Sequence, residues 1–369
     1  MNITIVSLWA QKLFRKEEPQ PFGGAELQLV LLARELVKLP GVNVRFITRG
    51  QGSWEKFESN GIEVHKLPYR TNRYTRSLLG FRDCLKECRN IPSDVYIQRG
   101  GGFETGITGH VAHNANKPFL FMTSHTWDVD GTHEKERGFL YGRVFMYGFN
   151  RASSIINQTD HQHDLLRKNY NRTSLVFRSA HPIPPELPEK REGVLWVGRC
   201  EPFKNPGLFL DLVAKMPEIP CTMVCPPANL DDMFVAIKNK ADSLANLRFL
   251  PGVPFDETER LFASHRIMVN TSTQEGYPNT YVQSFKWGVP VITALFDPDD
   301  IIERHSMGLR AGDDVEAMKQ AVMALLSDNE RWNIYSRNAR TFACEQHDAQ
   351  KIAARLYAHL QEIIERHHQ

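Results

Sequence analysis

Residues 22–48, FGGAELQLVLLARELVKLPGVNVRFIT, decide the fold that we expect for this chain. Apolar residues recur at helical spacing over 25–39, and Pro40-Gly41 then ends the helix. A short apolar stretch, Ile3–Leu8, precedes this segment and is typical of a buried strand, and Val42–Thr48 is typical of the next one. A strand, a helix and a second strand in this order form a βαβ unit, which predicts a parallel sheet.

The same alternation runs to about residue 184 and starts again at Gly193, after a segment rich in proline. We therefore expect an α/β protein with two Rossmann-like, doubly wound domains, whose ligands bind at the carboxyl ends of the strands and in the cleft between the domains. Residues 314–327 and 330–365 are amphipathic and predict two long helices. The expected limits are a first domain over 1–184, a linker over 185–192, a second domain over 193–345, and a C-terminal helix over 346–369 that could pack back on the first domain.

The composition is that of an ordinary globular protein, with 41% hydrophobic and 24% charged residues and a net charge of +2. Charge is unevenly spread, because residues 1–100 hold 16 Lys/Arg against 10 Asp/Glu. This excess favours an anionic partner for the first half, such as a phosphate or a lipid headgroup, and ordinary surface variation is the alternative. No aromatic and basic pattern of a nucleic-acid-binding module is present, so nucleic acid is not an expected partner.

The cysteines do not have the spacing of a zinc site, and they are scattered over a long chain. We expect reduced thiols in a cytoplasmic protein, without a signal peptide or a spanning helix, and with no metal ion. Association with the inner face of the membrane remains open. The six cysteines are Cys84, Cys88, Cys200, Cys221, Cys225 and Cys344.

Two segments at the ends of expected strands suit phosphate binding. Gly23 and Gly24 precede a helix, where backbone amides and the helix dipole attract an anion, although a plain turn explains the glycines equally well. Arg199 follows the strand Gly193–Val197, and Lys204 comes five residues later. An arginine fork and a lysine point charge suit a diphosphate, and two solvated cations are the alternative.

The most informative segment runs from Thr271 to Pro290, TSTQEGYPNTYVQSFKWGVP. An expected strand leads here into Glu275, a glycine turn and a helix that starts near Asn279. The free amides of that first turn would face a phosphate or a sugar. Gln283 lies one turn into the helix, back towards the same cleft.

Two further features follow the expected strand Phe119–Thr123. His125 is a candidate for proton transfer or hydrogen bonding, although a lone histidine is more often structural. Asp128-Val129-Asp130 has the Asp-x-Asp form used by metal-dependent enzymes of another fold. We attribute it to chance, because a repeated two-domain α/β series is the wrong setting for that motif.

Taken together, these motifs resemble the family-4 retaining glycosyltransferases of the GT-B fold. The resemblance covers nearly the whole chain, and its Glu-Gly-Tyr-Pro-Asn-Thr block with the following Gly-Val-Pro looks most like bacterial enzymes of surface-polysaccharide assembly. It implies transfer of a sugar from a nucleotide-diphosphate donor, a UDP- or GDP-sugar, to a glycan or lipid-linked acceptor, with no cofactor and no metal ion.

The resemblance also implies roles for single residues. Arg199 and Lys204 would bind the diphosphate and stabilise the leaving nucleotide, Glu275 would contact the transferred sugar, and His125 would lie beside that sugar. The remaining implied binding positions, beside the phosphates, the sugar, the ribose and the base of the donor, are Gly23, Gly24, Val253, Tyr277, Pro278, Asn279, Thr280 and Gln283.

Gln283 departs from the family pattern, which has a second glutamate at this position. A glutamine oxygen still accepts a hydrogen bond from a ribose hydroxyl, but it lacks the charge that strengthens such a bond. Two alternatives therefore stay open: a nucleotide-sugar epimerase of the same fold, and a non-catalytic sugar-nucleotide-binding assembly subunit.

Residues 69–89 combine basic and apolar side chains, and they suggest a peripheral contact with an anionic membrane. A solvated loop and helix is the alternative. The basic residues of this stretch are Arg70, Arg73, Arg76, Arg82, Lys86 and Arg89, and its apolar residues include Leu78, Leu79 and Phe81.

Overall fold

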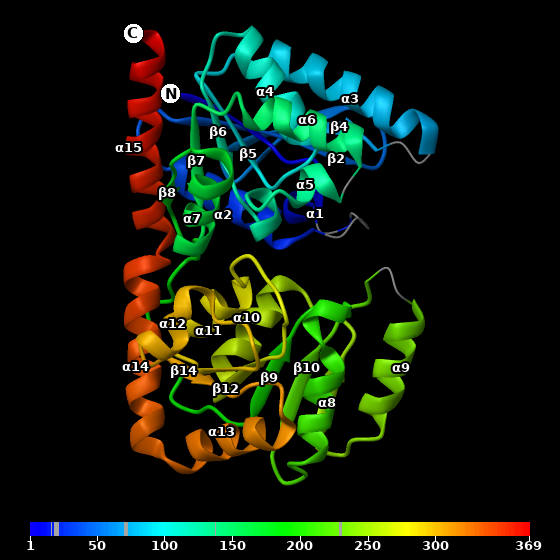
Figure 1. The fold of residues 1–369 in the computed structure, drawn as a ribbon, viewed down its shortest axis with the longest axis vertical. Helices are drawn as coiled ribbons and strands as arrows, with labels where there is room; N and C mark the ends of the chain where they lie inside the picture. The colour runs from blue at the N-terminus through cyan, green and yellow to red at the C-terminus, as the bar shows by residue number, and fades with distance from the viewer. Residues whose placement is uncertain (16, 18–21, 70–72, 137, 229–230) are drawn as a thin grey trace. The chain divides into compact units, whose positions relative to one another are not determined.

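The computed structural model describes residues 1–15, 17, 22–69, 73–136, 138–228 and 231–369, with only the backbone given for residues 73–78 and 231. The chain divides into two compact units, which are considered separately (Figure 1). Unit 1 comprises Met1–Pro182 and Ala349–Gln369, and unit 2 comprises Ile183–Asp348.

Unit 1 is built on an eight-stranded sheet in the order β3-β4-β2-β1-β5-β6-β7-β8. All its neighbouring strands are parallel except β3 and β4, which form an antiparallel pair at one edge. Chain order reverses between β1 and β5, so the loops that follow these two strands diverge and leave room for a ligand. The strands are β1 (Asn2–Val6), β2 (Asn43–Gly50), β3 (Glu55–Ser59), β4 (Ile62–Pro68), β5 (Val95–Arg99), β6 (Phe119–Met122), β7 (Ser154–Asn157) and β8 (Leu175–Val176).

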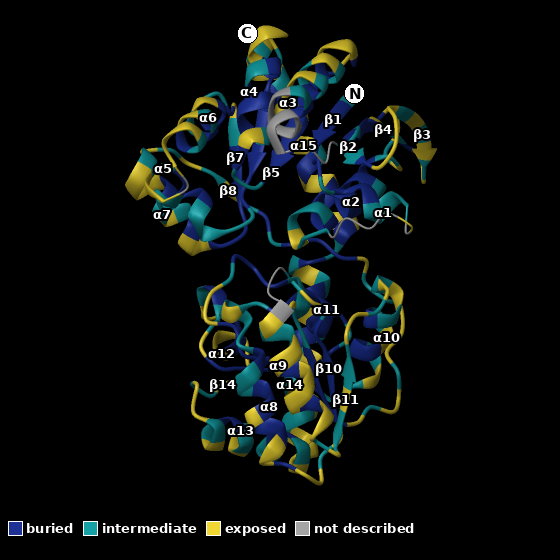
Figure 2. Cartoon of the chain, turned by 90° about the vertical axis from the view of Figure 1, so that its right-hand side faces the viewer, coloured by how far each residue is buried: buried dark blue, intermediate teal, exposed yellow. Residues whose placement is uncertain are grey.

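Helices cover this sheet, and its central strands are largely buried, whereas the edge strands β3 and β8 are partly exposed (Figure 2). The last helix of the chain joins the same hydrophobic core through residues such as Ile352, Leu356 and Leu360. The helices of unit 1 are α1 (Gln11–Phe14), α2 (Gly24–Leu36), α3 (Arg73–Asn90), α4 (Phe103–Asn114), η1 (Thr126–Asp128), α5 (Thr132–Lys135), α6 (Phe139–Phe149), α7 (Asp160–Tyr170) and α15 (Ala349–His368).

Unit 2 contains a six-stranded parallel sheet in the order β11-β10-β9-β12-β13-β14. Here the chain order reverses between β9 and β12. The strands are β9 (Val194–Val197), β10 (Cys221–Val224), β11 (Leu247–Leu250), β12 (Ile267–Asn270), β13 (Val291–Thr293) and β14 (Gly308–Arg310). The helices are η2 (Pro202–Lys204), α8 (Pro206–Ala214), α9 (Asp231–Asp242), α10 (Phe255–Ser264), α11 (Asn279–Lys286), η3 (Pro298–Asp300), α12 (Ile301–Arg304), α13 (Val315–Ser327) and α14 (Asn329–Gln346).

The stretch 330–365, expected to be helical, consists of two helices, α14 and α15, that end and begin around His347. The His347 side chain is fully buried and its ring contacts the Tyr277 hydroxyl, which fixes the chain at the break. The expected start of the C-terminal helix at residue 346 shifts to Ala349 for the same reason. Residues 185–192, expected as a linker, form no helix or strand and lie within unit 2.

The strand β3 and the helices α3, α4 and α6 were not anticipated from the sequence. β3 is a half-exposed edge strand with little apolar patterning, and α4 and α6 are interrupted by glycines. Within the described residues, no helix has the length and apolar character needed to cross a membrane.

Candidate functional site

The point where strand order reverses in unit 2 brings two polar loops together. β9 and β12 are hydrogen-bonded neighbours, so the loops 198–205 and 271–278 leave the same edge of the sheet. Thr271 ties them together, since its hydroxyl accepts a hydrogen bond from Trp196 Nε1 at 2.9 Å and donates one to the carbonyl of Lys204 at 2.7 Å. The Thr273 amide also donates to the carbonyl of Phe203 at 2.8 Å. The two predicted motifs therefore form one rigid platform.

An ion pair between Lys204 and Glu275 lies at the centre of this platform. Their side chains retain 17% and 12% of their exposure, so both are largely withdrawn from water without being sealed off. The Ser272 hydroxyl donates a second hydrogen bond to Glu275 Oε1 at 2.9 Å. The pair presents a cation that could meet a phosphate and a carboxylate oxygen that could accept a hydrogen bond from a sugar hydroxyl.

Arg199 lies on the same loop in a more open setting. Half of its side chain is exposed, and its guanidinium contacts Glu201 at 3.1 Å. An exposed ion pair of this kind contributes about 0–1 kcal/mol, so the guanidinium can turn towards a ligand at little cost. Lys204 and Arg199 thus both remain able to meet an anion.

The start of α11 adds backbone donors beside these side chains. Pro278 is the N-cap residue and no side chain of the described residues caps the helix. The first amides of the helix, from Asn279 and Thr280, lie where the helix dipole favours negative charge.

Three of the predicted binding residues have other partners in the structure. The Tyr277 side chain is buried and its hydroxyl contacts His347 Nε2 at 2.9 Å. Gln283 is buried and donates to Glu259. Val253 packs partly against the core cluster of α11, in the loop between β11 and α10.

The glycine loop of unit 1 differs from the expectation at one atom. Gly23 precedes α2 as predicted, but its amide donates a hydrogen bond to Glu26 Oε2 at 2.8 Å. A carboxylate of the same helix therefore occupies this donor in the structure, and the expected position of Gly23 beside the phosphates stays a prediction.

Asp128 organises the other edge loop of unit 1. Its carboxylate is buried and accepts hydrogen bonds from the amides of Gly101 (2.8 Å), Ser124 (2.6 Å) and His125 (3.1 Å), and it contacts His133 Nε2 at 2.8 Å. Burial alone would raise the pKa of Asp128, but the hydrogen bonds from His133 and the amides hold this pKa below its ordinary value. Asp128 therefore fixes the backbone that carries His125.

His125 is half-buried and caps η1, where its Nδ1 accepts a hydrogen bond from the Trp127 amide at 3.3 Å. Its ring lies 4.0 Å from that of Trp127, measured between centroids. Gly101 fits closely against the Asp128–His133 pair, since a Cβ there would lie 2.1 Å from His133 Nε2. No sequence pattern singles out His133, whose contact with Asp128 is visible only in the fold.

Arg99 and Glu104 are two further residues that the sequence analysis missed. Arg99 ends β5 at the reversal point of unit 1, and burial lowers its pKa to about 10 although Asp128 and Glu26 lie near it. Burial raises the pKa of Glu104, at the start of α4, while Arg49 nearby opposes that shift. Charged side chains withdrawn from water at such an edge are typical of functional sites.

Among the described residues, the acidic motifs do not form an open metal site. Asp128 is engaged as above, and Asp130 accepts a hydrogen bond from the Thr132 amide at 2.8 Å. Three other carboxylates, on Asp297, Asp300 and Glu303, lie close enough to share an ion. Asp297, however, accepts hydrogen bonds from the amides of Ile302 and Glu303 in the first turn of α12. The other two carboxylates pair with Arg310, whose single charge offsets one of theirs.

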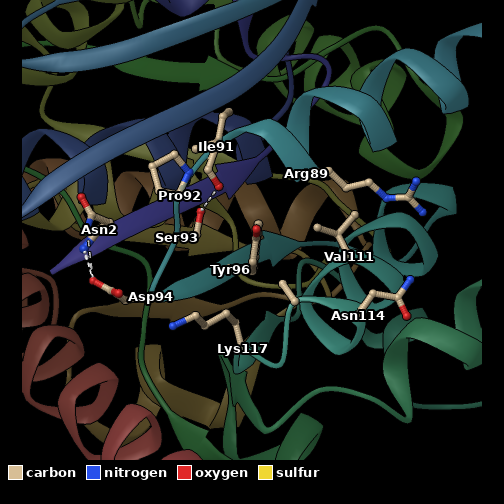
Figure 3. Close-up of a pocket in the computed structure, with 11 residues that line it drawn as sticks. Asn2, Arg89, Ile91, Pro92, Ser93, Asp94, Tyr96, Val111, Asn114 and Lys117 are labelled. Atoms are coloured by element: carbon tan, nitrogen blue, oxygen red, sulfur yellow. Dashed lines mark hydrogen bonds between the residues drawn. The ribbon is translucent and has the colours of Figure 1, made fainter.

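A pocket of about 540 Å³ lies at the opposite edge of the unit 1 sheet (Figure 3). It is lined by residues at the amino ends of β1 and β5, and Asp94 in it accepts a hydrogen bond from the Asn2 amide at 2.7 Å. Ligands of doubly wound sheets bind at the other end of the strands. We therefore place the candidate site at the reversal points instead.

Comparisons with known proteins concern the fold and the activity of the chain. Residues 191–328 match the family described as "Glycosyl transferases group 1". A curated relative from Campylobacter jejuni, GalNAc-alpha-(1->4)-GalNAc-alpha-(1->3)-diNAcBac-PP-undecaprenol alpha-1,4-N-acetyl-D-galactosaminyltransferase, is 25% identical over 332 residues, which are 84% of this chain and 87% of that protein.

Solved structures show the same fold at low identity. Sucrose-phosphate synthase from Thermosynechococcus elongatus has a TM-score of 0.76 at 13% identity, over 98% of this chain and 99% of that one. WaaG, a glycosyltransferase involved in lipopolysaccharide biosynthesis, has a TM-score of 0.67 at 16% identity, over 96% and 98%. The epimerase alternative finds no support in these comparisons. The chain is a glycosyltransferase of the GT-B fold, and its residues 191–328 are similar to the glycosyltransferases of group 1.

Proposed function

We propose that this glycosyltransferase takes a sugar from a UDP- or GDP-sugar bound at the reversal point of unit 2 and transfers it with retention of anomeric configuration and without a metal ion. The ion pair of Lys204 with Glu275 carries this proposal, because it joins a cation for the diphosphate to a carboxylate for the sugar. Two basic side chains, Lys204 and Arg199, can stabilise the charge that develops on the leaving nucleotide, which is the role a metal ion has elsewhere.

The other contacts of the donor follow from the resemblance. The amides of Asn279 and Thr280 would bind phosphate or sugar, Gln283 would accept a hydrogen bond from the ribose, and Val253 would lie near the base. In unit 1, Gly23 and Gly24 would lie near the phosphates, and His125 would lie beside the transferred sugar. These roles stay predictions.

We propose a lipid-linked glycan as the acceptor. The name of the Campylobacter relative describes a transferase that acts on a saccharide linked to PP-undecaprenol. That relative is 25% identical over most of both chains, which supports a similar class of acceptor here.

The test is to incubate the protein with UDP- and GDP-sugars and saccharides linked to a polyprenyl diphosphate, in excess chelator. We expect acceptor-dependent release of nucleoside diphosphate, and nuclear magnetic resonance should show the anomeric configuration of the donor in the product. Activity that disappears in chelator and returns with manganese would contradict the metal-free mechanism. Nucleotide binding without transfer to any acceptor would favour a non-catalytic assembly subunit.

We also propose that unit 1 contacts an anionic membrane through an apolar surface on α3 and α6. Phe139 and Leu140, at the start of α6, are 76% and 68% exposed, and Phe81 and Tyr147 are also exposed. An apolar groove of about 330 Å³ lies between these helices. Of the basic residues expected to help, Arg82, Lys86 and Arg89 are exposed on α3, whereas Arg70 and the side chains of Arg73 and Arg76 lie outside the described residues.

Flotation with vesicles of phosphatidylglycerol or of phosphatidylcholine tests this contact. We expect binding to the anionic vesicles that weakens in high salt and falls when Phe139 and Leu140 are both replaced by Ser. Val235→Ser, at an exposed apolar residue of unit 2, is the control and should leave flotation unchanged. Equal flotation of the double variant and the wild type would refute the proposed surface.

A further inference from the structure

Glu259 connects the predicted ribose-binding residue to a small buried polar network. It lies on α10, which packs against α11. Its carboxylate contacts three side chains, two of them on α11 and the third on the residue that follows this helix. Gln283 Nε2 donates to Glu259 Oε1 at 3.0 Å, while Trp287 Nε1 donates to Oε2 at 2.9 Å and the Lys286 ammonium lies 2.7 Å from Oε2. α10 follows the Val253 loop directly, so the network adjoins the predicted base and ribose positions.

This contact fixes the orientation of the Gln283 amide. A carboxylate can only accept hydrogen bonds, so the NH₂ end of Gln283 must face Glu259 and its Oε1 must point the other way. The described residues provide no donor to that oxygen. Gln283 thus has one fixed end and one end ready to accept a hydrogen bond from a hydroxyl.

The network also explains why a glutamine suits this position. The side chains of Lys286 and Glu259 are only 5% and 15% exposed, and one ammonium balances one carboxylate. A glutamate at position 283 would place a second carboxylate at hydrogen-bond distance from Glu259. Like charges that are largely withdrawn from water destabilise each other strongly.

We propose that Glu259 is a positioning residue for the ribose of the donor, and that α10 carries the negative charge that the family pattern places at position 283. Glu259 acts through Gln283, whose Oε1 it holds towards the ribose hydroxyls. This inference rests on the proposed function, since it needs a nucleotide at the reversal point of unit 2.

The substitution Glu259→Gln should turn the amide of Gln283 around. The new amide at position 259 has a single oxygen, which Lys286 and Trp287 both need as an acceptor. The NH₂ group of this new amide therefore faces Gln283, and it draws the Oε1 atom of Gln283 inward. In the charge-swapped variant Glu259→Gln/Gln283→Glu, the amide introduced on α10 donates to the carboxylate introduced on α11, and a charged oxygen faces the ligand. The swap also keeps the net charge of the network.

The readout is the ratio of Kd values for a nucleoside diphosphate and its 2′-deoxy and 3′-deoxy forms, measured by calorimetry with UDP and GDP. In the wild type, the nucleoside diphosphate with an intact ribose should bind about 3- to 10-fold more tightly than at least one of its two deoxy forms, as expected for one hydrogen bond. The ratio should fall towards one in Glu259→Gln and return to at least the wild-type value in the charge-swapped variant. Glu257→Gln, on the same helix, is the control and should keep the wild-type ratio.

Each outcome bears on a definite claim. If the ratio of Kd values is unchanged in Glu259→Gln, the positioning role is overturned while nucleotide binding stands. The same conclusion follows if the wild type binds the ribose and deoxy forms equally. A charge-swapped variant that binds nucleotide but does not recover the ratio also overturns it. Failure of the wild type to bind any nucleotide refutes the proposed function itself, and the inference with it.

Discussion

At the scale of single residues, the site combines local sequence patterns with contacts between distant residues, and only the local patterns were predictable. Glu275 stands beside a glycine after an apolar strand, and Lys204 lies in the loop that follows another strand, as the sequence displays directly. Arg99 and Glu259 belong to no motif in the sequence, and the Asp-x-Asp form of Asp128 does not show what its carboxylate binds. Their partners, such as Gly101 for Asp128, come from other elements, so their roles appear only once the sheet is assembled.

Removing the ammonium of Lys204 tests the electrostatic part of the mechanism. We expect Lys204→Ala to lower kcat by about 10²- to 10³-fold, the effect typical of losing one donor to a developing negative charge. The matched control is Lys240→Ala, which breaks an exposed ion pair with Asp211 in the same unit and should leave kcat unchanged. Steady-state kinetics on the two variants distinguishes them, and equal activity of Lys204→Ala and wild type would exclude the proposed role.

Asp128 should make the stability of unit 1 dependent on pH. Because its pKa is lowered in the folded state, its contribution is present above the unfolded-state pKa of about 3.9 and disappears as the pH falls below that value. We expect Asp128→Asn to reduce the free energy of unfolding by about 2–3 kcal/mol at pH 7, since one of the two acceptor oxygens is replaced by an NH₂ group that faces buried donors.

Urea unfolding of wild type and Asp128→Asn between pH 3 and 7 measures this difference. The difference in the free energy of unfolding between the two proteins should become smaller below pH 4. A gap that stays constant over the whole range would show that the charge of Asp128 adds nothing to stability.

At the scale of elements, the central strands and their following helices were predictable from apolar spacing, whereas the glycine-bearing helices were not. α4 and α6 cross at very short range, and glycines on both make this possible. A glycine in a helix weakens the helical pattern in the sequence. It also allows a second helix to approach closely, and the sequence does not show that contact. α4 begins directly after Gly102, so this crossing also supports the loop held by Asp128.

Gly148→Ala tests the crossing of α4 and α6. The added Cβ would lie 2.0 Å from the carbonyl oxygen of Thr105, and the helices would have to separate. We expect a loss of about 1–3 kcal/mol in the free energy of unfolding, the usual cost of overpacking. Gly207→Ala, in α8, meets no atom within 4 Å and should be neutral or stabilising by up to about 1 kcal/mol. Chemical denaturation that ranks the two variants the other way would contradict the packing account.

At the scale of the whole molecule, two α/β units with the same kind of strand reversal were expected from the repeated alternation in the sequence. The last helix follows unit 2 in the chain but belongs to unit 1, the domain on which the C-terminal helix was expected to pack. The point where this helix begins was harder to predict, because the amphipathic pattern continues through the break at His347. The central claim concerns unit 2 alone: a nucleotide diphosphate binds beside Lys204, Glu275 and the start of α11.

A thermal-shift screen with UDP, GDP and their common sugar conjugates tests that claim most directly, because a ligand that binds the native state raises its Tm. We predict that at least one nucleotide raises the Tm of the wild type and of Lys240→Ala, and that the shift is strongly reduced in Lys204→Ala. If no nucleotide raises the Tm, or if Lys204→Ala responds as the wild type does, the donor site is not where we place it.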